Sequence, residues 1–134
     1  MTPDITPPDQ EPDITYEHLS EEVTVVRLGS DPANHVLSVY TASVLRAASV
    51  DLTNQGRYRL VLDLRGLAFL DSTGLLVITA ARRRARAQGG DLAVVLTDER
   101  LRKIFRITGL TNVFALHDTV ERAVEDVVRK TRRL

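Results

Sequence analysis

The sequence predicts an α/β domain in which helices pack on a mixed, partly parallel sheet. From residue 58 onward, strand-like and helix-like segments alternate three times, a pattern typical of sheets with parallel strands. The strand predicted over residues 58–64 is apolar on both faces, as expected where helices cover both sides of a sheet. The 134 residues are 43% hydrophobic, enough to bury the core of one domain.

The N-terminal part of this domain is predicted to hold three strands. Residues 23–28 have the composition of a strand, and residues 14–18 are expected to pair with it. Residues 29–34 are a cluster of turn-forming residues, and residues 35–38 follow as a short strand.

A helix is predicted over residues 41–55, where apolar residues recur at helical spacing. Gly56 ends it, as glycine commonly does after a last turn. The strand over residues 58–64 comes next, and residues 65–70 form a short connection to the second helix. The apolar face of the first helix consists of Val44, Leu45, Ala48 and Leu52.

The second helix is predicted over residues 73–87, before Gly89-Gly90. It is expected to bury Leu75, Leu76, Ile78 and Thr79. Its C-terminal half carries Arg82, Arg83, Arg84 and Arg86. These cations complement the negative end of the helix dipole, and they are either a solvated helix end or contacts for phosphate groups.

A buried strand over residues 92–96 leads into a third helix, capped by Asp98 or Thr97. Gly109 ends this helix. Its shared apolar face consists of Leu101, Ile104 and Phe105.

Residues 112–116 are predicted to form the last strand. Asp118 is expected to cap the final helix, with Glu121 three residues on in a capping-box arrangement. The buried stripe of that helix consists of Val120, Ala123, Val124, Val127 and Val128.

Composition excludes several classes of protein. With no cysteine, the chain can form neither a disulfide framework nor a thiolate metal site. A formal net charge of zero gives no general attraction to nucleic acid. No apolar run approaches the roughly 20 residues of a membrane span, and the acidic, Pro-rich N-terminus does not resemble a secretory signal. We expect a cytoplasmic protein that binds neither nucleic acid nor membrane.

Charge is distributed unevenly along the chain. Residues 1–22 hold seven acidic and no basic residues, so the remainder carries a net charge of +7. Four of the five prolines lie in the first twelve residues. We therefore predict a disordered tail over residues 1–13, a domain over 14–130 and a basic tail over 131–134. The acidic tail is either solvated or screens a basic face.

The junction between the central strand and the second helix is the candidate functional site. Asp71-Ser72-Thr73-Gly74-Leu75 follows the apolar pair Phe69-Leu70. Ser72 is predicted to be the exposed or partly exposed N-cap of the helix. The first amides of a helix and its dipole also favour a bound phosphate. The hydroxyl is therefore a simple cap or a phosphorylation site.

No enzyme motif accompanies this serine. The sequence has no phosphate-binding glycine loop and no Gly-x-Ser-x-Gly element around Ser72. His18, His35 and His117 fall in separate elements without metal-ligand spacing, and none has an evident place beside Ser72. We expect no catalysis, no metal and no cofactor, and a small hydrolase using Ser72 is the least favoured alternative.

Two motifs resemble a known family. Phe69-Leu70-Asp71-Ser72-Thr73-Gly74-Leu75, followed about 35 residues later by Ile107-Thr108-Gly109-Leu110, resembles the signature of bacterial anti-sigma-factor antagonists, the STAS domain family. The resemblance covers roughly residues 20–128. It implies a single STAS-like domain with a mixed β-sheet and helices packed against it.

The resemblance also implies a partner switch. The unphosphorylated protein would bind an anti-sigma factor that is a serine kinase, and this kinase would phosphorylate Ser72, with Thr73 as the second choice. A PP2C-type phosphatase would reverse the modification. The implied partner-binding residues are Asp71, Ser72, Thr73, Gly74, Ser38 and Tyr40. The alternative is an unphosphorylated scaffold or ligand-sensing subunit of a regulatory complex, in which Ser72 is only a cap.

One element departs from the family pattern. Family members often carry Gly-Glu-x-Asp before the first helix, and its aspartate lies near the phosphorylated serine. The matching stretch here is residues 35–40, in which Ser38 stands at the position of the aspartate and the glycine and glutamate are missing. Gly29-Ser30-Asp31 is a candidate remnant of that element, displaced by an insertion. The departure keeps the scaffold alternative open.

Overall fold

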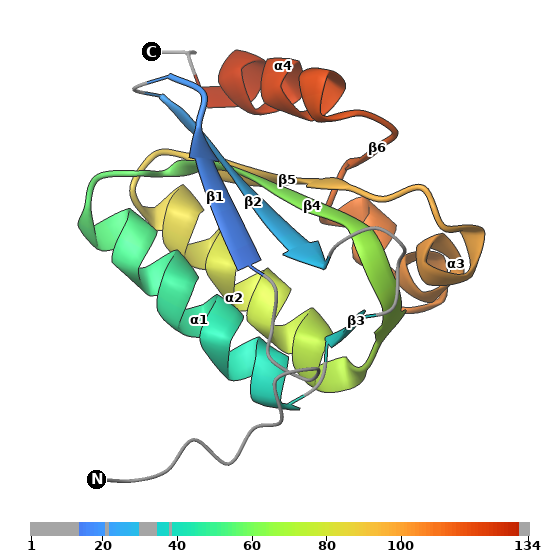
Figure 1. The fold of residues 1–134 in the computed structure, drawn as a ribbon. Coiled ribbons are helices and arrows are strands. Elements are labelled where there is room, and N and C mark those ends of the chain that lie inside the picture. Colours follow the sequence, from blue (N-terminus) through green and yellow to red (C-terminus); the bar gives the residue numbers. More distant parts are fainter. Residues whose placement is uncertain (1–13, 21, 30–34, 38, 132–134) are drawn as a thin grey trace, which may run out of the picture.

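A mixed sheet with helices on both faces forms the molecule (Figure 1). The computed structural model describes residues 14–20, 22–29, 35–37 and 39–131. The strands are β1 (Ile14–His18), β2 (Val23–Gly29), β3 (His35–Leu37), β4 (Arg59–Leu70), β5 (Asp91–Val95) and β6 (Leu116–His117). The helices are α1 (Val39–Asn54), α2 (Ser72–Ala87), α3 (Glu99–Ile107) and α4 (Val120–Thr131). The predicted tail over residues 1–13 lies outside the described residues.

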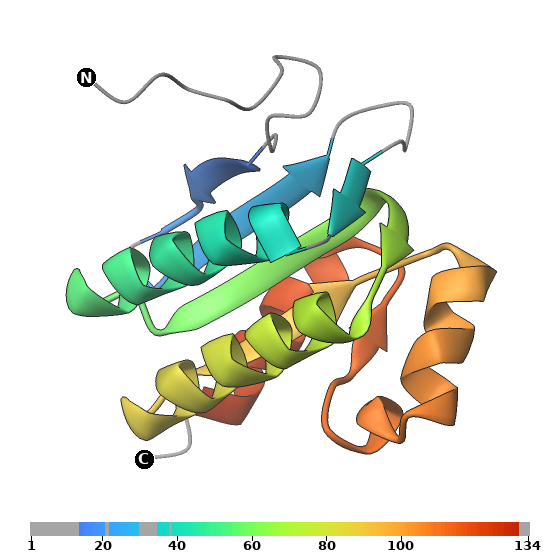
Figure 2. The same cartoon turned by 90° about the horizontal axis from the view of Figure 1, so that it is seen from below.

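The strand order is β1-β2-β4-β5-β6, and β3 pairs separately with the end of β4. The β1–β2 pair is antiparallel, and every other pair is parallel. This arrangement confirms the predicted mixed sheet and the predicted pairing of residues 14–18 with β2. Helices α1 and α2 run side by side on one face, and α4 covers the other (Figures 1 and 2).

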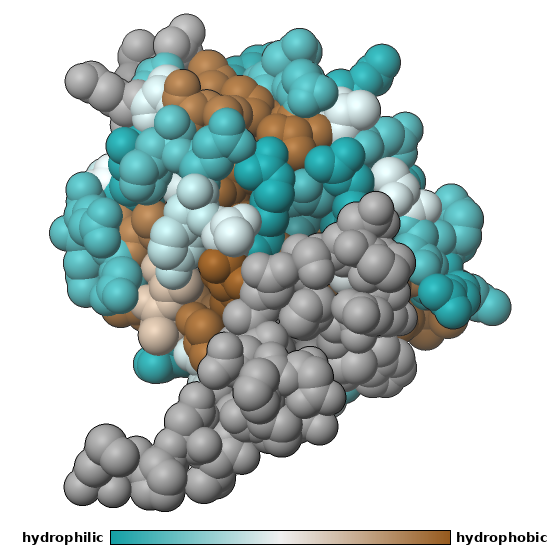
Figure 3. Space-filling model, in the orientation of Figure 1, coloured by the Kyte–Doolittle hydropathy of each residue, from teal (hydrophilic) through white to brown (hydrophobic). Residues whose placement is uncertain are grey.

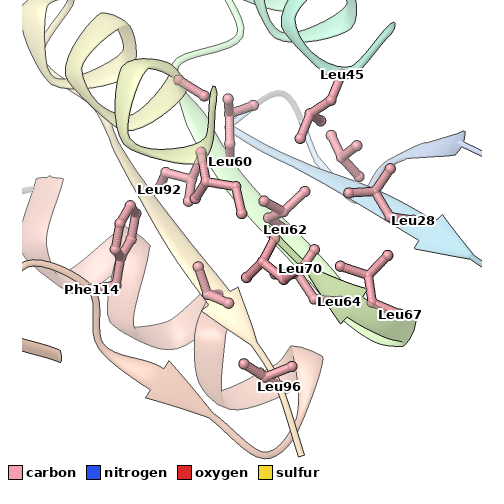
Figure 4. Close-up of a cluster of buried hydrophobic side chains, with 14 of the residues drawn as sticks. Leu28, Leu45, Leu60, Leu62, Leu64, Leu67, Leu70, Leu92, Leu96 and Phe114 are labelled. Carbon is pink, nitrogen blue, oxygen red and sulfur yellow. The ribbon is translucent and has the colours of Figure 1, made fainter. Parts of the chain in front are cut away.

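The two faces of β4 bury two separate cores. Leu60, Leu62 and Leu64 point towards α1 and α2, where they join the larger cluster drawn in Figure 4. Val61 points the other way and packs with valines of α4. The predicted burial of this strand on both faces is therefore confirmed, and it explains why its sequence does not alternate between polar and apolar residues.

A buried carboxylate interrupts the α4 side of β4. Asp63 is 5% exposed, and its two oxygens accept hydrogen bonds of 2.9 and 2.8 Å from the Arg65 guanidinium. Arg27 of β2 lies 3.5 Å away on the same face. Burial favours the neutral acid, but the hydrogen bonds from Arg65 and the charges of Arg65 and Arg27 outweigh it and hold the pKa of Asp63 below its ordinary value.

An apolar strip crosses the top of the molecule in Figure 3, where α4 lies in Figure 1. It borders a shallow groove of about 460 Å³ between α4 and the β1–β2 hairpin. Leu19, Val120 and Val124 form its apolar part, and the charged side chains on its rim belong to β1, β2, β4 and α4. No sequence motif points to this groove.

Two predicted boundaries are wrong. The connection predicted over residues 65–70 continues β4, because β3 supplies a parallel partner through the pairs Val36–Phe69 and Leu37–Leu70. The strand predicted over residues 112–116 shrinks to β6. A 3₁₀ turn takes its place, since the Val113 and Phe114 amides donate to the Leu110 carbonyl.

The cap predicted for the last helix is also wrong. Thr119 immediately precedes α4, and its hydroxyl accepts a hydrogen bond of 3.2 Å from the Arg122 amide. Asp118 instead pairs with Arg102 of α3 at 2.6 Å. Helix α4 extends through Thr131, the first residue of the predicted C-terminal tail, whose hydroxyl accepts a 2.6 Å bond from Arg59.

Candidate functional site

The β4–α2 junction places Asp71 at the N-cap of α2. Leu70, the last residue of β4, is buried, and Asp71 leaves the strand in an extended conformation. Its Oδ1 accepts a hydrogen bond of 2.9 Å from the Gly74 amide, and its carbonyl accepts the first helical bond from Leu75 at 3.1 Å. A carboxylate here also faces the positive end of the helix dipole.

The prediction that Ser72 is the N-cap is therefore wrong by one residue. Aspartate and serine cap helices about equally well, and the pattern alone does not decide which of two neighbours starts the helix. Ser72 is the first helical residue and is exposed. Among the described residues its hydroxyl has no hydrogen-bond partner, so it is open to a modifying enzyme.

Thr73 is less accessible than Ser72. Its exposure is intermediate, and Gly74 beside it is buried. The two hydroxyl residues therefore differ in access although they are neighbours in sequence. Ser72 is therefore the more accessible of the two hydroxyl residues.

Leu76 lies on the same face of α2 as Ser72, one turn further on. Its side chain is 71% exposed, so the prediction that it is buried is wrong. The buried face of the helix consists of Gly74, Ile78, Ala81 and Ala85. Leu76 is two residues, or about 200°, from Gly74 on the helical wheel and so points away from the sheet. The helical spacing of Leu76 relative to Gly74 is therefore the feature of the sequence that identifies it as a surface residue.

The predicted partner residues before α1 are only partly described. Tyr40 lies in the first turn of α1, while Ser38, Ser30 and Asp31 lie outside the described residues. The backbone nevertheless brings the starts of α1 and α2 to one end of the sheet. Helix α1 follows β3 and α2 follows β4, and these two strands end together in a parallel pair. Figure 2 shows the two helices running in the same direction from that end.

His18 and His117 lie apart from this site. His18 is hydrogen-bonded to Thr24 at 2.9 Å, and His117 lies 3.1 Å from the Asp126 carboxylate. Within the ranges that the structure describes, no group of His, Asp and Glu side chains could hold a metal ion. Over the same ranges, no helix is long and apolar enough to cross a membrane.

Comparisons with known proteins agree in pointing to one family. The STAS domain family matches residues 19–123. An anti-sigma-B factor antagonist of Bacillus subtilis is 36% identical over 89 residues, which cover 66% of this chain and 81% of that protein.

Solved structures share the fold. The crystal structure of an anti-sigma factor antagonist from Mycobacterium paratuberculosis superposes with a TM-score of 0.72 and 24% identity, covering 92% of this chain and 98% of that one. The phosphorylated form of the Bacillus cell fate determinant SpoIIAA gives a TM-score of 0.66 and 23% identity, covering 86% and 99%.

Proposed function

This chain belongs to the STAS domain family, and we propose that it is an anti-sigma-factor antagonist switched by phosphorylation of Ser72. The observation that carries the proposal is the exposed Ser72 hydroxyl at the start of α2, which has no hydrogen-bond partner among the described residues. Relatives named as anti-sigma-factor antagonists support the binding function. A structural neighbour described in a phosphorylated form supports the switch.

In the unphosphorylated state, the first two turns of α2 dock on the anti-sigma factor. Ser72 and Leu76 form the centre of this surface, Asp71 and Thr73 lie beside them, and Tyr40 stands in the first turn of α1 at the same end of the sheet. Leu76 supplies apolar area, and burying a leucine side chain completely contributes about 1.5–3 kcal/mol. The neighbouring hydroxyl and the start of the helix supply hydrogen-bonding groups.

The proposed partner is an anti-sigma factor that is also a serine kinase. It transfers the γ-phosphoryl group of ATP to Ser72 Oγ, so that the new O–P bond replaces the bond to ADP and a base of the kinase takes the hydroxyl proton. A PP2C-type phosphatase directs water onto the phosphorus, which regenerates the hydroxyl and releases inorganic phosphate. The antagonist itself contributes only the acceptor serine.

The phosphate acts on the interface more than on the fold. It adds about −1.5 to −2 charges. The dipole of α2 stabilises this charge locally, and Asp71 continues to cap the helix. Docking would then bury a dianion beside the Asp71 carboxylate. A loss of only about 1.4 kcal/mol weakens binding tenfold, which one misplaced charge can supply.

The test is a titration of wild type, Ser72→Ala and Ser72→Asp against kinase-type anti-sigma factors encoded in the same genome. Ser72→Ala should bind like wild type and no longer accept phosphate in an intact-mass assay. Ser72→Asp should bind at least about tenfold more weakly. Thr73→Ala is the matched control and should still be phosphorylated. If wild type, Ser72→Ala and Ser72→Asp all bind one of these anti-sigma factors with equal affinity, the switch is refuted and the scaffold alternative is favoured.

A further inference from the structure

The second sequence motif, Ile107-Thr108-Gly109-Leu110, ends α3 and begins the turn after it. Three of its residues have structural roles. The Thr108 hydroxyl donates a hydrogen bond of 2.7 Å to the Ile104 carbonyl, and Leu110 packs on the larger core cluster. Gly109 takes a φ of +77°, a left-handed conformation that favours glycine. Ile107 belongs to neither core cluster and is 73% exposed, so burial in the described part of the domain does not explain an apolar side chain there.

Ile107 and Leu76 are the two most exposed large apolar residues that the structure describes, at 73% and 71%. Ile107 lies two residues, or about 200° on the helical wheel, from the buried Phe105, so it points away from the core. Val113, which follows the 3₁₀ turn Leu110–Asn112, is 38% exposed. Single exposed apolar residues are common on protein surfaces, whereas a group of them on adjoining elements indicates a contact surface.

Helix α2 lies between α1 and α3 (Figures 1 and 2). On one side, Arg84 of α2 donates a hydrogen bond of 2.5 Å to the Ser49 hydroxyl of α1. On the other side, the Arg82 guanidinium lies 5.8 Å from the centre of the Phe114 ring. That ring packs edge-on against Phe105 of α3, with 6.1 Å between the ring centroids. The outer surface of α2 therefore adjoins that of α3 and of the turn after it.

A surface on α2 alone is too small for a stable complex. Specific interfaces involve about 20–30 residues on each partner, whereas the first two turns of a helix hold about seven. An interface centred on Leu76 must therefore extend over a neighbouring helix. Among the side chains of α1 that the structure describes, from Ala42 onward, no large apolar one is exposed. The apolar part of the interface can therefore continue over α3, where Ile107 is exposed.

We propose that the anti-sigma factor binds across α2 and α3, with Leu76 and Ile107 as the two apolar anchors and Val113 at the margin. This inference rests on the function proposed above and assigns the chemistry of the partner surface. The apolar centre of that surface covers the two anchors.

The charge of α3 defines the rest of the partner surface. Residues 99–107 carry four cations and one acid, a net charge of +3. Lys103 is exposed and lies one turn before Ile107 on the same face of the helix. The partner is therefore acidic beside its apolar centre. An acidic partner surface also suits the switch, because it would repel a phosphate on Ser72.

Titration of variants with the kinase-type anti-sigma factor that binds wild type tests this surface. Ile107→Gln keeps a helix-forming side chain and should weaken binding about tenfold, with an unchanged Tm. Leu19→Gln, the same kind of change at the exposed leucine after β1, should bind like wild type. Lys103→Glu should slow association, and the effect should shrink in high salt. Arg122→Glu, a charge reversal at an exposed residue of α4, should have no comparable effect. If Ile107→Gln lowers the Tm, the comparison of Lys103→Glu with Arg122→Glu decides.

The outcomes separate this surface from the phosphorylation switch. If Ser72→Asp weakens binding while Ile107→Gln binds like wild type, the contact through α3 is refuted and the switch stands. If Ile107→Gln weakens binding while Ser72→Asp does not, the surface is supported and the switch is refuted. Equal weakening by Ile107→Gln and Leu19→Gln would refute a contact specific to α3. If wild type binds none of the kinase-type anti-sigma factors, the proposed function and this surface both fail.

Discussion

The cap of α2 separates the role of Asp71 from that of Ser72, and their alanine variants should differ in stability. Asp71 accepts the Gly74 amide at 2.9 Å, and removing an N-cap side chain costs about 0.5–2 kcal/mol. Ser72 is exposed and makes no side-chain hydrogen bond among the described residues, while alanine is the better helix former by a few tenths of a kcal/mol. Asp71→Ala should therefore lower the free energy of unfolding by about 1 kcal/mol, and Ser72→Ala should leave it unchanged or slightly raise it.

Urea unfolding followed by far-UV circular dichroism measures both effects. For a chain of this length, 1 kcal/mol corresponds to a fall in Tm of about 3–5 °C. Asp71→Ser is the matched control, because a serine at the N-cap keeps an oxygen in place and should recover most of the loss. A loss in Ser72→Ala equal to or larger than that in Asp71→Ala would refute the assignment of Asp71 as the cap.

Three further substitutions test other parts of the structure. Leu76→Ala should change the free energy of unfolding by less than about 0.5 kcal/mol. It should weaken binding of the anti-sigma factor about tenfold or more in a titration. Leu19 is an exposed leucine at the opposite end of the sheet, and Leu19→Ala is the control for that titration. Asp63→Asn should destabilise the domain at neutral pH. Because the pKa of Asp63 is depressed in the folded state, its contribution is present above the unfolded pKa of about 3.9 and is lost as pH falls through the folded pKa. The difference in free energy of unfolding between wild type and Asp63→Asn, measured by urea unfolding, should therefore vanish below about pH 4. A difference that does not change with pH would contradict the pairing with Arg65. Gly90→Ala should cost about 1–3 kcal/mol or more, because its Cβ would lie 1.9 Å from the Tyr58 carbonyl oxygen; an unchanged Tm would show that this close approach is absent.

Local patterns in the sequence predicted most elements, because their causes are local. The apolar spacing of α1 and α4 and the continuous apolar runs of β4 and β5 correspond to the observed helices and strands. The end of β4 could not be predicted in this way. Residues 65–70 remain a strand because β3, some thirty residues earlier in the chain, pairs with them.

The errors at the site have two different physical origins. The sequence predicts the cap one residue late because Asp71 and Ser72 are adjacent and both are good capping residues, so only the geometry of the helix start separates them. The apolar character of Leu76 predicts a core position, although the buried face of α2 carries Gly74 and Ile78. Hydrophobicity predicts burial there, but the helical periodicity places Leu76 on the outer face of α2.

The cap at Asp71 has a consequence for how a switch at Ser72 would operate. If Ser72 were the N-cap, its phosphorylation would change the hydrogen bond that starts α2, and modification would alter the stability of the domain. With Asp71 accepting the Gly74 amide, the helix start is held whether or not the serine carries a phosphate. The added charge then acts on whatever docks against Ser72 and Leu76. The proposed switch can therefore change affinity by an order of magnitude while the fold stays the same, and a kinase and a phosphatase would meet the same local backbone.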